Sequence, residues 1–210
     1  MPSSDLVPSS VSTRRSFLRA ASIAAAAGVF AGAGSVQAHA EAGPAVSAAD
    51  RERVRALAKW TALSFDTPGP VPFGAEIVDS KSGVRLMRAL NAVGPEHDPS
   101  AHAELRTIRL ACAKLRSPSL RGYTLYTTCE PCPMCMACIL WAGLDRVVYG
   151  ATIADAARFG NQIQIPAAEV AKRGDMHCVV DGPVEHDACL ALFTDPRMQA
   201  TFARWKATTR

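Results

Sequence analysis

The sequence lacks any apolar run long enough to cross a membrane. Its longest apolar stretch, rich in alanine and ending near Gly34, covers about fourteen residues and falls short of the roughly 20 that a transmembrane helix needs. No run of Lys and Arg lies near the cysteine-rich motif, and no repeat or low-complexity segment follows the first forty residues. These absences predict a chain without a permanent membrane anchor or a repeat architecture.

The first forty residues have the pattern of an export signal. Arg14-Arg15 resembles the core of a twin-arginine motif, and an apolar stretch and a short run of small residues follow it. We therefore expect a signal peptide over 1–40, cleavage after Ala40, and an exported, periplasmic domain over 41–210. The twin-arginine route carries folded proteins, so a metal would be bound before the chain meets an oxidising compartment. The alternative is that the two arginines are incidental and that the segment is simply disordered.

The domain that would remain after cleavage is almost neutral. Residues 1–40 hold three arginines and one aspartate, so their removal lowers the formal net charge from +4 to +2. A protein that edits RNA is expected to present a basic surface to the phosphates. The weak charge and the predicted export together favour a small-molecule substrate and argue against a nucleic-acid partner.

Two cysteines and one histidine have the spacing of a zinc site. Cys132 and Cys135 stand three residues apart, so a helix would place both on one face. Pro131 would occupy the first helical position, and the helix start would favour anionic thiolates. Among the five histidines, His102 is followed two residues later by a carboxylate, and we assign it as the third ligand. Three protein ligands leave the fourth position of a catalytic zinc ion for water.

Glu104 is the predicted catalytic residue. Residues two apart on a helix are separated by roughly 200°, so Glu104 cannot point in the same direction as His102. Its carboxylate is expected to flank the zinc-bound water rather than to bind the metal. There it would accept a proton from the water, pass it to a ring nitrogen and later to departing ammonia.

The order of these motifs resembles a known family. His102-Ala103-Glu104, followed by Pro131-Cys132-Pro133-Met134-Cys135, is similar to the HxE and PCxxC signature of the zinc-dependent nucleobase deaminases. The resemblance covers about 71–160 and is nearest to guanine deaminases, with tRNA adenosine deaminases second. It implies a cytidine deaminase-like fold, a Zn²⁺ cofactor and hydrolytic deamination of a free purine base or nucleoside, with guanine giving xanthine and ammonia.

Two alternative functions stay open. A tRNA adenosine deaminase would use the same chemistry on a larger substrate. A non-catalytic zinc module would use the metal only to hold its fold while it binds a partner. Structural zinc sites normally have four protein ligands, so three ligands with a nearby carboxylate argue against such a module.

The resemblance also implies contacts to the purine. Phe73 would border the base, Asn91 and the Ala103 backbone would hydrogen-bond it, and Asp155 would bind its polar edge. Three of these residues have structural alternatives. Phe73 could belong to the core, Asn91 could be a turn residue, and Asp155 could cap a helix that begins at Ala156.

The other cysteines are interpreted as structural. Cys129 and Cys138 are close to the ligands in sequence, but a fourth thiolate would close the water position, so both are predicted to pack in the interior. Cys178 and Cys189 are predicted to be free, and a disulfide formed after export is the alternative.

The region after the signal suits one α/β domain. A turn at 79–83 between two strand-like runs predicts a β-hairpin, and strand–helix–strand order over 123–149 predicts a crossover unit. We predict a three-layer α/β/α sandwich around a mixed sheet of about five strands. The expected helices cover about 50–63, 102–115, 132–144, 166–172 and 196–206, and the expected strands cover 75–78, 84–90, 123–128, 146–149 and 176–180.

The last expected helix carries Met198, Phe202 and Trp205 at helical spacing, which we interpret as a stripe that joins the core. The resemblance to guanine deaminases implies an alternative, in which this segment covers the active site of a neighbouring subunit. The same resemblance implies a homodimer.

Overall fold

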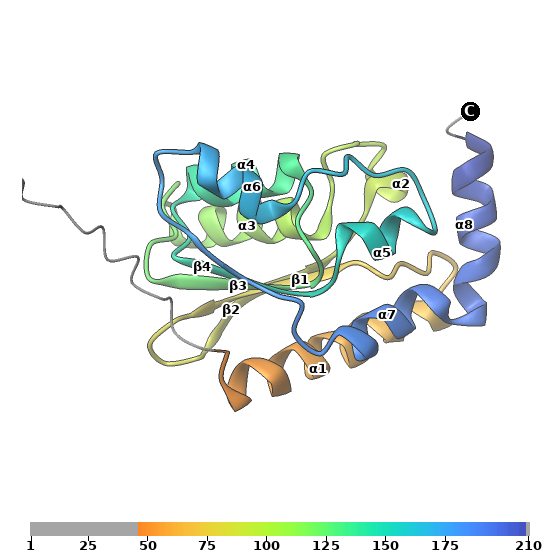
Figure 1. The fold of residues 1–210 in the computed structure, drawn as a ribbon, viewed down its shortest axis with the longest axis horizontal. Helices are drawn as coiled ribbons and strands as arrows, with labels where there is room; N and C mark the ends of the chain where they lie inside the picture. Colours follow the sequence, from red (N-terminus) through yellow and green to blue (C-terminus); the bar gives the residue numbers. More distant parts are fainter. Residues whose placement is uncertain (1–45, 209–210) are drawn as a thin grey trace, which may run out of the picture. The chain divides into compact units, whose positions relative to one another are not determined.

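The computed structural model describes residues 46–208, so the predicted signal peptide and its cleavage site lie outside the described residues (Figure 1). A mixed five-stranded sheet in the order β2-β1-β3-β4-β5 forms the centre of the domain. Its strands are β1 (Gly74–Asp79), β2 (Arg85–Leu90), β3 (Tyr123–Cys129), β4 (Arg146–Ala151) and β5 (Val179–Asp181).

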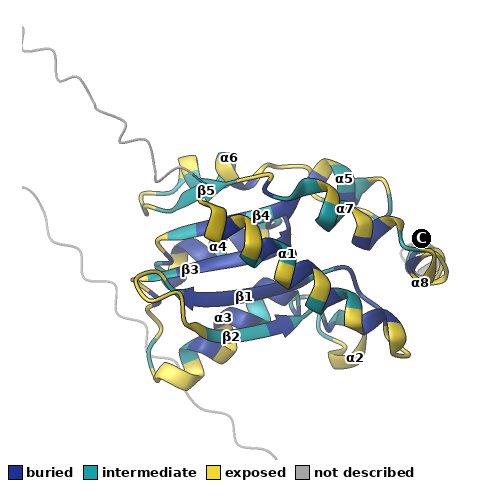
Figure 2. Ribbon diagram, turned by 90° about the horizontal axis from the view of Figure 1, so that it is seen from below, coloured by how far each residue is buried: buried dark blue, intermediate teal, exposed yellow. Residues whose placement is uncertain are grey.

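The sheet combines both pairing directions. Strand β1 pairs antiparallel with β2, as the hairpin prediction requires, and antiparallel with β3. Strands β3, β4 and β5 are parallel to one another. The central strands β1, β3 and β4 are almost wholly buried (Figure 2), as expected of strands covered on both faces.

Helices cover the two faces of the sheet, which confirms the predicted three-layer α/β fold (Figure 1). Helices α3 (Ala103–Leu115), α4 (Pro133–Ala142) and α6 (Ala167–Arg173) lie on one side, and α1 (Ala48–Ala62) and α7 (His186–Thr194) lie on the other. The short elements η1 (Leu63–Asp66), α2 (Val93–Glu96) and α5 (Ile153–Ala157) connect these layers, and α8 (Pro196–Thr208) follows α7.

Two local predictions were wrong, and one helix was missed. Helix α4 begins at Pro133, which takes the first helical position assigned to Pro131, and Cys132 becomes the N-cap. Strand β5 is displaced towards the C-terminus from the predicted 176–180 and pairs with only three residues of β4. Helix α7 was not predicted because it is short and its start carries no side-chain cap: Glu185, the N-cap residue, has a left-handed backbone.

A buried polar network fastens α1 to the sheet. Asp50 accepts hydrogen bonds from the Tyr126 hydroxyl at 2.5 Å and from the Arg146 guanidinium at 2.9 Å. The Nε atom of Arg146 also donates to Asp181 on β5, at 2.6 Å. Arg146, at the start of β4, therefore binds one carboxylate on α1 and another on β5.

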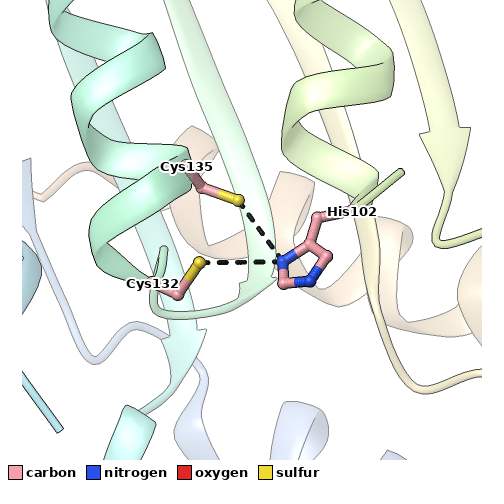
Figure 3. A group of neighbouring side chains, drawn as sticks. All are labelled: His102, Cys132 and Cys135. Atoms are coloured by element: carbon pink, nitrogen blue, oxygen red, sulfur yellow. Dashed lines mark hydrogen bonds between the residues drawn. The ribbon is translucent and has the colours of Figure 1, made fainter. Parts of the chain in front are cut away.

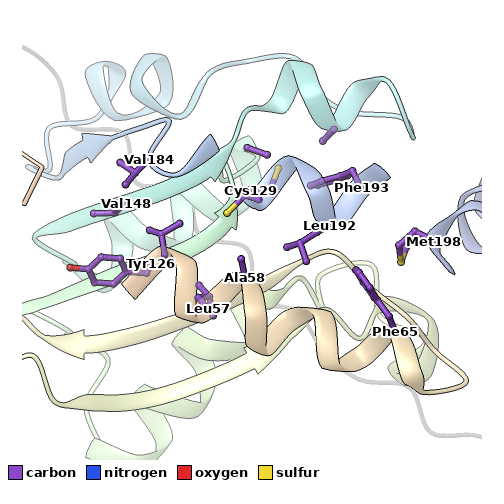
Figure 4. Close-up of a cluster of buried hydrophobic side chains, with 14 of the residues drawn as sticks. Leu57, Ala58, Phe65, Tyr126, Cys129, Val148, Val184, Leu192, Phe193 and Met198 are labelled. Atoms are coloured by element: carbon purple, nitrogen blue, oxygen red, sulfur yellow. The ribbon is translucent and has the colours of Figure 1, made fainter. Parts of the chain in front are cut away.

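Helix α8 packs on its own chain. Met198 is completely buried and Phe202 is 5% exposed, and both belong to the core cluster that includes residues of α1, β3, β4 and α7. Figure 4 shows Met198 at one end of this cluster. Phe202 contacts Phe159 at a ring-centroid distance of 5.3 Å and Trp205 at 5.5 Å. The interpretation of the stripe as core is confirmed for Met198 and Phe202. Within residues 46–208, each helix falls short of the length and apolar character of a membrane span.

Candidate zinc centre

The starts of two helices bring the predicted metal ligands together. His102 is the N-cap residue of α3 and Cys132 is the N-cap residue of α4, and both have extended backbones. Cys135 lies in the first turn of α4. Figure 3 shows the two cysteines on α4 facing the imidazole ring of His102 at the start of α3.

The distances among the three side chains suit one zinc ion. The Nδ1 atom of His102 lies 3.7 Å from Sγ of Cys132 and 3.5 Å from Sγ of Cys135. All three ligand atoms lie within 4.8 Å of one another. Tetrahedral zinc with ordinary Zn–S and Zn–N bonds separates its ligand atoms by about 3.5–3.8 Å. The nitrogen and sulfur donors are also those that zinc prefers, so the residues fit the ion in both chemistry and spacing.

The electrostatics of the site favour a thiolate. Hydrogen bonds from Cys135 and, to a smaller extent, His102 lower the pKa of Cys132 to about 4, against the opposing effect of burial. Helix starts carry unpaired N–H groups, which add to this preference for negative charge. One metal-binding thiolate is therefore available at neutral pH.

Glu104 lies in the first turn of α3 and is 6% exposed. Burial raises its pKa to about 7, against the lowering effect of His102. A carboxyl group with a pKa near neutrality can both accept and donate a proton in this pH range. The buried carboxyl group beside the ligands thus has the properties of a proton shuttle.

The structure places Phe73 and Asn91 together at one end of the β1–β2 hairpin. The backbone N–H of Asn91 donates to the Phe73 carbonyl at 3.0 Å. The Phe73 ring packs edge-to-face on Phe193, at 5.3 Å between centroids, and is stacked on Trp205 at 6.5 Å. Phe73 is therefore part of the aromatic packing, which is the structural alternative raised for it. Ala103 is fully buried at the start of α3.

Asp155 belongs to a capping box. Helix α5 begins at Ile153 rather than at Ala156, and Thr152 is its N-cap. The Asp155 carboxylate accepts hydrogen bonds from the Thr152 N–H at 3.0 Å and from the Thr152 hydroxyl at 2.6 Å. His186 Nε2 lies 2.8 Å from the same carboxylate oxygen. The capping alternative for Asp155 is thus realised, although at the third helical position instead of the cap itself.

A buried polar residue that holds the backbone around Phe73 was missed. Thr128, fully buried at the end of β3, donates through its hydroxyl to the Pro72 carbonyl at 2.8 Å and accepts from the Gly74 N–H at 3.0 Å. These two bonds hold the backbone on both sides of Phe73. Because β3 contains three buried threonines, the sequence has no signal that distinguishes Thr128 from the other two.

The remaining cysteines pack without forming disulfides. Cys129 is buried, Cys138 is half-buried beside the core, and Cys178 and Cys189 are both free. No fourth thiolate is assigned to the metal group, whose members within residues 46–208 are His102, Cys132 and Cys135.

Comparison with known proteins identifies related sequences. The model of the family described as "Cytidine and deoxycytidylate deaminase zinc-binding region" matches residues 48–151. The guanine deaminase of Bacillus subtilis (strain 168) is 47% identical over 89 residues, which cover 42% of this chain and 56% of that protein. A tRNA-specific adenosine deaminase of Rickettsia bellii (strain RML369-C) is 34% identical over 99 residues, which cover 47% of this chain and 68% of that protein.

A solved structure shares the fold. The guanine deaminase from Nitrosomonas europaea superposes with a TM-score of 0.63 at 26% identity, covering 73% of this chain and 87% of that one. The chain spans about half the length of several curated relatives that it matches, including the B. subtilis guanine deaminase.

Proposed function

Since this chain belongs to the cytidine and deoxycytidylate deaminase zinc-binding family, we propose that it removes the amino group of a free purine base or nucleoside by hydrolysis of the C–N bond. Guanine, which would give xanthine and ammonia, is the proposed substrate. The observation that carries the proposal is the buried Glu104 carboxyl group, which interacts with the ligand group of His102, Cys132 and Cys135.

The ligand group defines what the metal would contribute. His102, Cys132 and Cys135 would hold zinc through one nitrogen and two sulfur atoms, and no fourth protein ligand belongs to the group in the described part of the chain. When bound, zinc would supply Lewis acidity that activates water as a nucleophile near neutral pH.

Glu104 would move the proton during the reaction. Its carboxylate would take a proton from the attacking water and deliver it to the ring nitrogen beside the amino-bearing carbon. It would then take the second proton from the hydroxyl group that the water has added to the carbon and pass it to the amino nitrogen. The C–N bond breaks, the carbonyl forms, and ammonia leaves as a neutral molecule. Burial favours this cycle because a carboxyl group whose pKa is about 7 releases and regains a proton readily near that pH.

Residues from the β1–β2 hairpin, α3 and α5 would select the base. Phe73 would border the ring, Asn91 and the Ala103 backbone would hydrogen-bond it, and Asp155 would bind its polar edge. The contact between Asn91 and Phe73 supports a shared location for the first two. The Oδ2 atom of Asp155 already binds Thr152 and His186. Asp155 would therefore bind the purine through its other carboxylate oxygen, Oδ1.

We propose a small substrate rather than tRNA because the domain carries little net charge. After removal of 1–40 the formal net charge would be +2, since that segment holds three arginines and one aspartate of a chain with a net charge of +4. The names of the relatives include both guanine deaminase and tRNA-specific adenosine deaminase. Similarity therefore supports the chemistry, and the charge supports the choice of a free purine.

We also propose export by the twin-arginine route with cleavage after Ala40, and a homodimeric assembly. The first rests on the sequence pattern of residues 1–40 and the second on family resemblance. Fractionation of cells that express the full chain, followed by N-terminal sequencing of the periplasmic form, tests the first. Light scattering of that form tests the second.

A substrate panel tests the proposed function. Zinc-loaded protein is incubated with guanine, guanosine, adenine, adenosine, cytosine and a tRNA anticodon stem-loop, and released ammonia is measured. Ammonia from guanine or guanosine supports the proposal. Activity confined to the stem-loop would replace it with the RNA-editing alternative, and silence on every compound with zinc bound would favour the non-catalytic module.

A further inference from the structure

A buried carboxylate that the proposed chemistry does not use lies two residues before a metal ligand. Glu130 is 9% exposed and follows the end of β3. Its Oε2 atom accepts a hydrogen bond from the Ile153 N–H at 3.0 Å, and its Oε1 atom accepts one from the Ala167 N–H at 2.9 Å. Its own N–H donates to the Ala151 carbonyl at 2.7 Å.

Both amides that Glu130 binds are the first residues of helices. Ile153 begins α5 and Ala167 begins α6. N–H groups in the first turn of a helix have no partner within the helix. A carboxylate there forms charge-assisted hydrogen bonds and interacts favourably with the helix dipole. One side chain therefore satisfies two helix starts at once, with one oxygen atom assigned to each.

The same side chain connects the parts of the candidate site. On one side it belongs to the loop that leads directly into Cys132. On the other side it holds the start of α5, the helix that carries Asp155. Neither α5 nor α6 has a long helical body to fix its direction, since they span five and seven residues. A side chain next to the metal loop thus binds the first N–H group of both short helices.

We propose that Glu130 is a positioning residue that holds residues 153–167 against the metal loop and thereby sets the affinity for the purine. This inference rests on the proposed function, because the affinity concerned is that for the deamination substrate. Glu130 itself neither binds the metal nor transfers a proton. Its effect on the reaction is transmitted through the positions of α5 and α6.

The variant Glu130→Gln tests this role with little change in size. Glutamine retains one acceptor oxygen, but its NH₂ group would face the second helix N–H, so one of the two bonds is lost. We expect KM for the purine to rise about tenfold while kcat changes by less than about twofold, the pattern of lost substrate binding. Zinc content should remain at the wild-type level. Glu130→Asp, which keeps two oxygens on a shorter side chain, should give a smaller rise in KM.

Asp181→Asn is the matched control. It also replaces a carboxylate that accepts a short hydrogen bond, here from Arg146 at 2.6 Å, but its partner lies in the network that fastens α1 to the sheet. If the control raises KM as much as Glu130→Gln, general loosening of the fold explains the effect and the proposal is wrong. Loss of zinc from Glu130→Gln would also overturn it, because it would assign Glu130 to support of the metal.

Amide hydrogen exchange separates this proposal from the proposed function. In Glu130→Gln the amide that loses its acceptor, that of Ile153 or that of Ala167, should exchange at least about tenfold faster than in the wild type, whereas those of α1 should not change. This readout holds even if the wild type deaminates no purine, an outcome that would refute the function alone. Unchanged exchange at both amides would refute the positioning role whatever the activity.

Discussion

The Nδ1 atom of His102 lies 3.5 Å from Sγ of Cys135, although the two residues are separated by 33 positions in the chain. Each residue stands at the start of its own helix, and strand β3 lies between them in sequence. The ligand group therefore forms only when α3 and α4 are side by side on the same face of the sheet. Metal binding and correct folding are coupled in such a site.

Removal of one ligand should abolish zinc binding. The wild type should hold one zinc ion per chain, and His102→Ala should hold less than about a tenth of that amount, because two thiolates alone are too few for a stable mononuclear site. Elemental analysis after gel filtration measures the content. Cys138→Ser, which changes a thiol one turn beyond Cys135, is the matched control and should keep its zinc. Equal zinc content in both variants would contradict the assignment of His102.

The Asp50 network should make stability depend on pH in the acid range. Burial alone would raise the pKa of Asp50, but hydrogen bonds from Tyr126, Arg146 and Ser47 outweigh it and hold the pKa well below its usual value. A carboxyl group with a lowered pKa stabilises the fold fully above its unfolded-state pKa of about 3.9. That contribution is lost as the pH falls from there towards the folded-state pKa.

Asp50→Asn tests this contribution. Breaking a buried ion pair costs roughly 3–5 kcal/mol, and because Arg146 keeps Asp181 we expect a loss of about 2 kcal/mol in the free energy of unfolding at pH 7. The difference between wild type and variant should shrink as the pH is lowered from 6 to 2.5. Urea unfolding at a series of pH values measures it. A difference that stays constant over this range would show that the charge of Asp50 is not responsible.

Asp155 and His186 should be thermodynamically linked. The hydrogen bond to Asp155, with a further contribution from Asp187, raises the pKa of His186. A histidine with a raised pKa adds stability that is complete below its unfolded-state pKa of about 6.5 and is lost as the pH rises through the folded-state value. Asp155→Ala, which also removes the carboxylate half of the capping box of α5, should therefore cost about 1 kcal/mol or more at pH 6 and less at pH 8.5.

An NMR titration of His186 provides the direct readout. Its pKa should fall towards the ordinary value in Asp155→Ala. Asp187→Asn is the control, because Asp187 is fully exposed and its separation from His186 is longer, 3.2 Å against 2.8 Å. A larger fall in the control than in Asp155→Ala would contradict the importance of the bond between α5 and α7.

Helix α8 should contribute to the stability of its own chain. Phe202 is 5% exposed and packs among aromatic rings, so Phe202→Ala should cost about 3 kcal/mol in the free energy of unfolding. Gln199→Ala, on the exposed side of the same helix, should change it by less than about 0.5 kcal/mol. Because the contacts are within one chain, the loss should not depend on protein concentration. A loss that disappears on dilution would instead favour packing on a neighbouring subunit.

Much of the fold could be predicted because its central elements are long and periodic. The runs that became β1, β2, β3 and β4, and the helix that follows His102, carry clear patterns of apolar residues. Helix α7 and strand β5 do not. The first lacks a capping side chain, and the second has three half-buried residues at the edge of the sheet. Their structure depends on tertiary packing, which a local pattern does not contain.

The same distinction applies to the site. The motif around His102 and Cys132 names the ligands because zinc chemistry restricts both residue type and spacing. Thr128 and Glu130 escaped notice because their partners are backbone groups 56 and 37 residues away. For Asp155 the sequence left capping and substrate contact open. In the structure its carboxylate binds Thr152 and His186. The contact with His186 could not be predicted, because that residue lies 31 positions further along the chain.

The central claim, that Glu104 transfers the proton in a zinc-dependent deamination, is tested most directly by Glu104→Gln. Purified wild type and variant are incubated with guanine, and both released ammonia and bound zinc are measured. We predict that the variant keeps its zinc while its rate falls by at least about a hundredfold, as expected for loss of a general acid–base group. Deamination at the wild-type rate, or loss of zinc together with activity, would contradict the role assigned to Glu104.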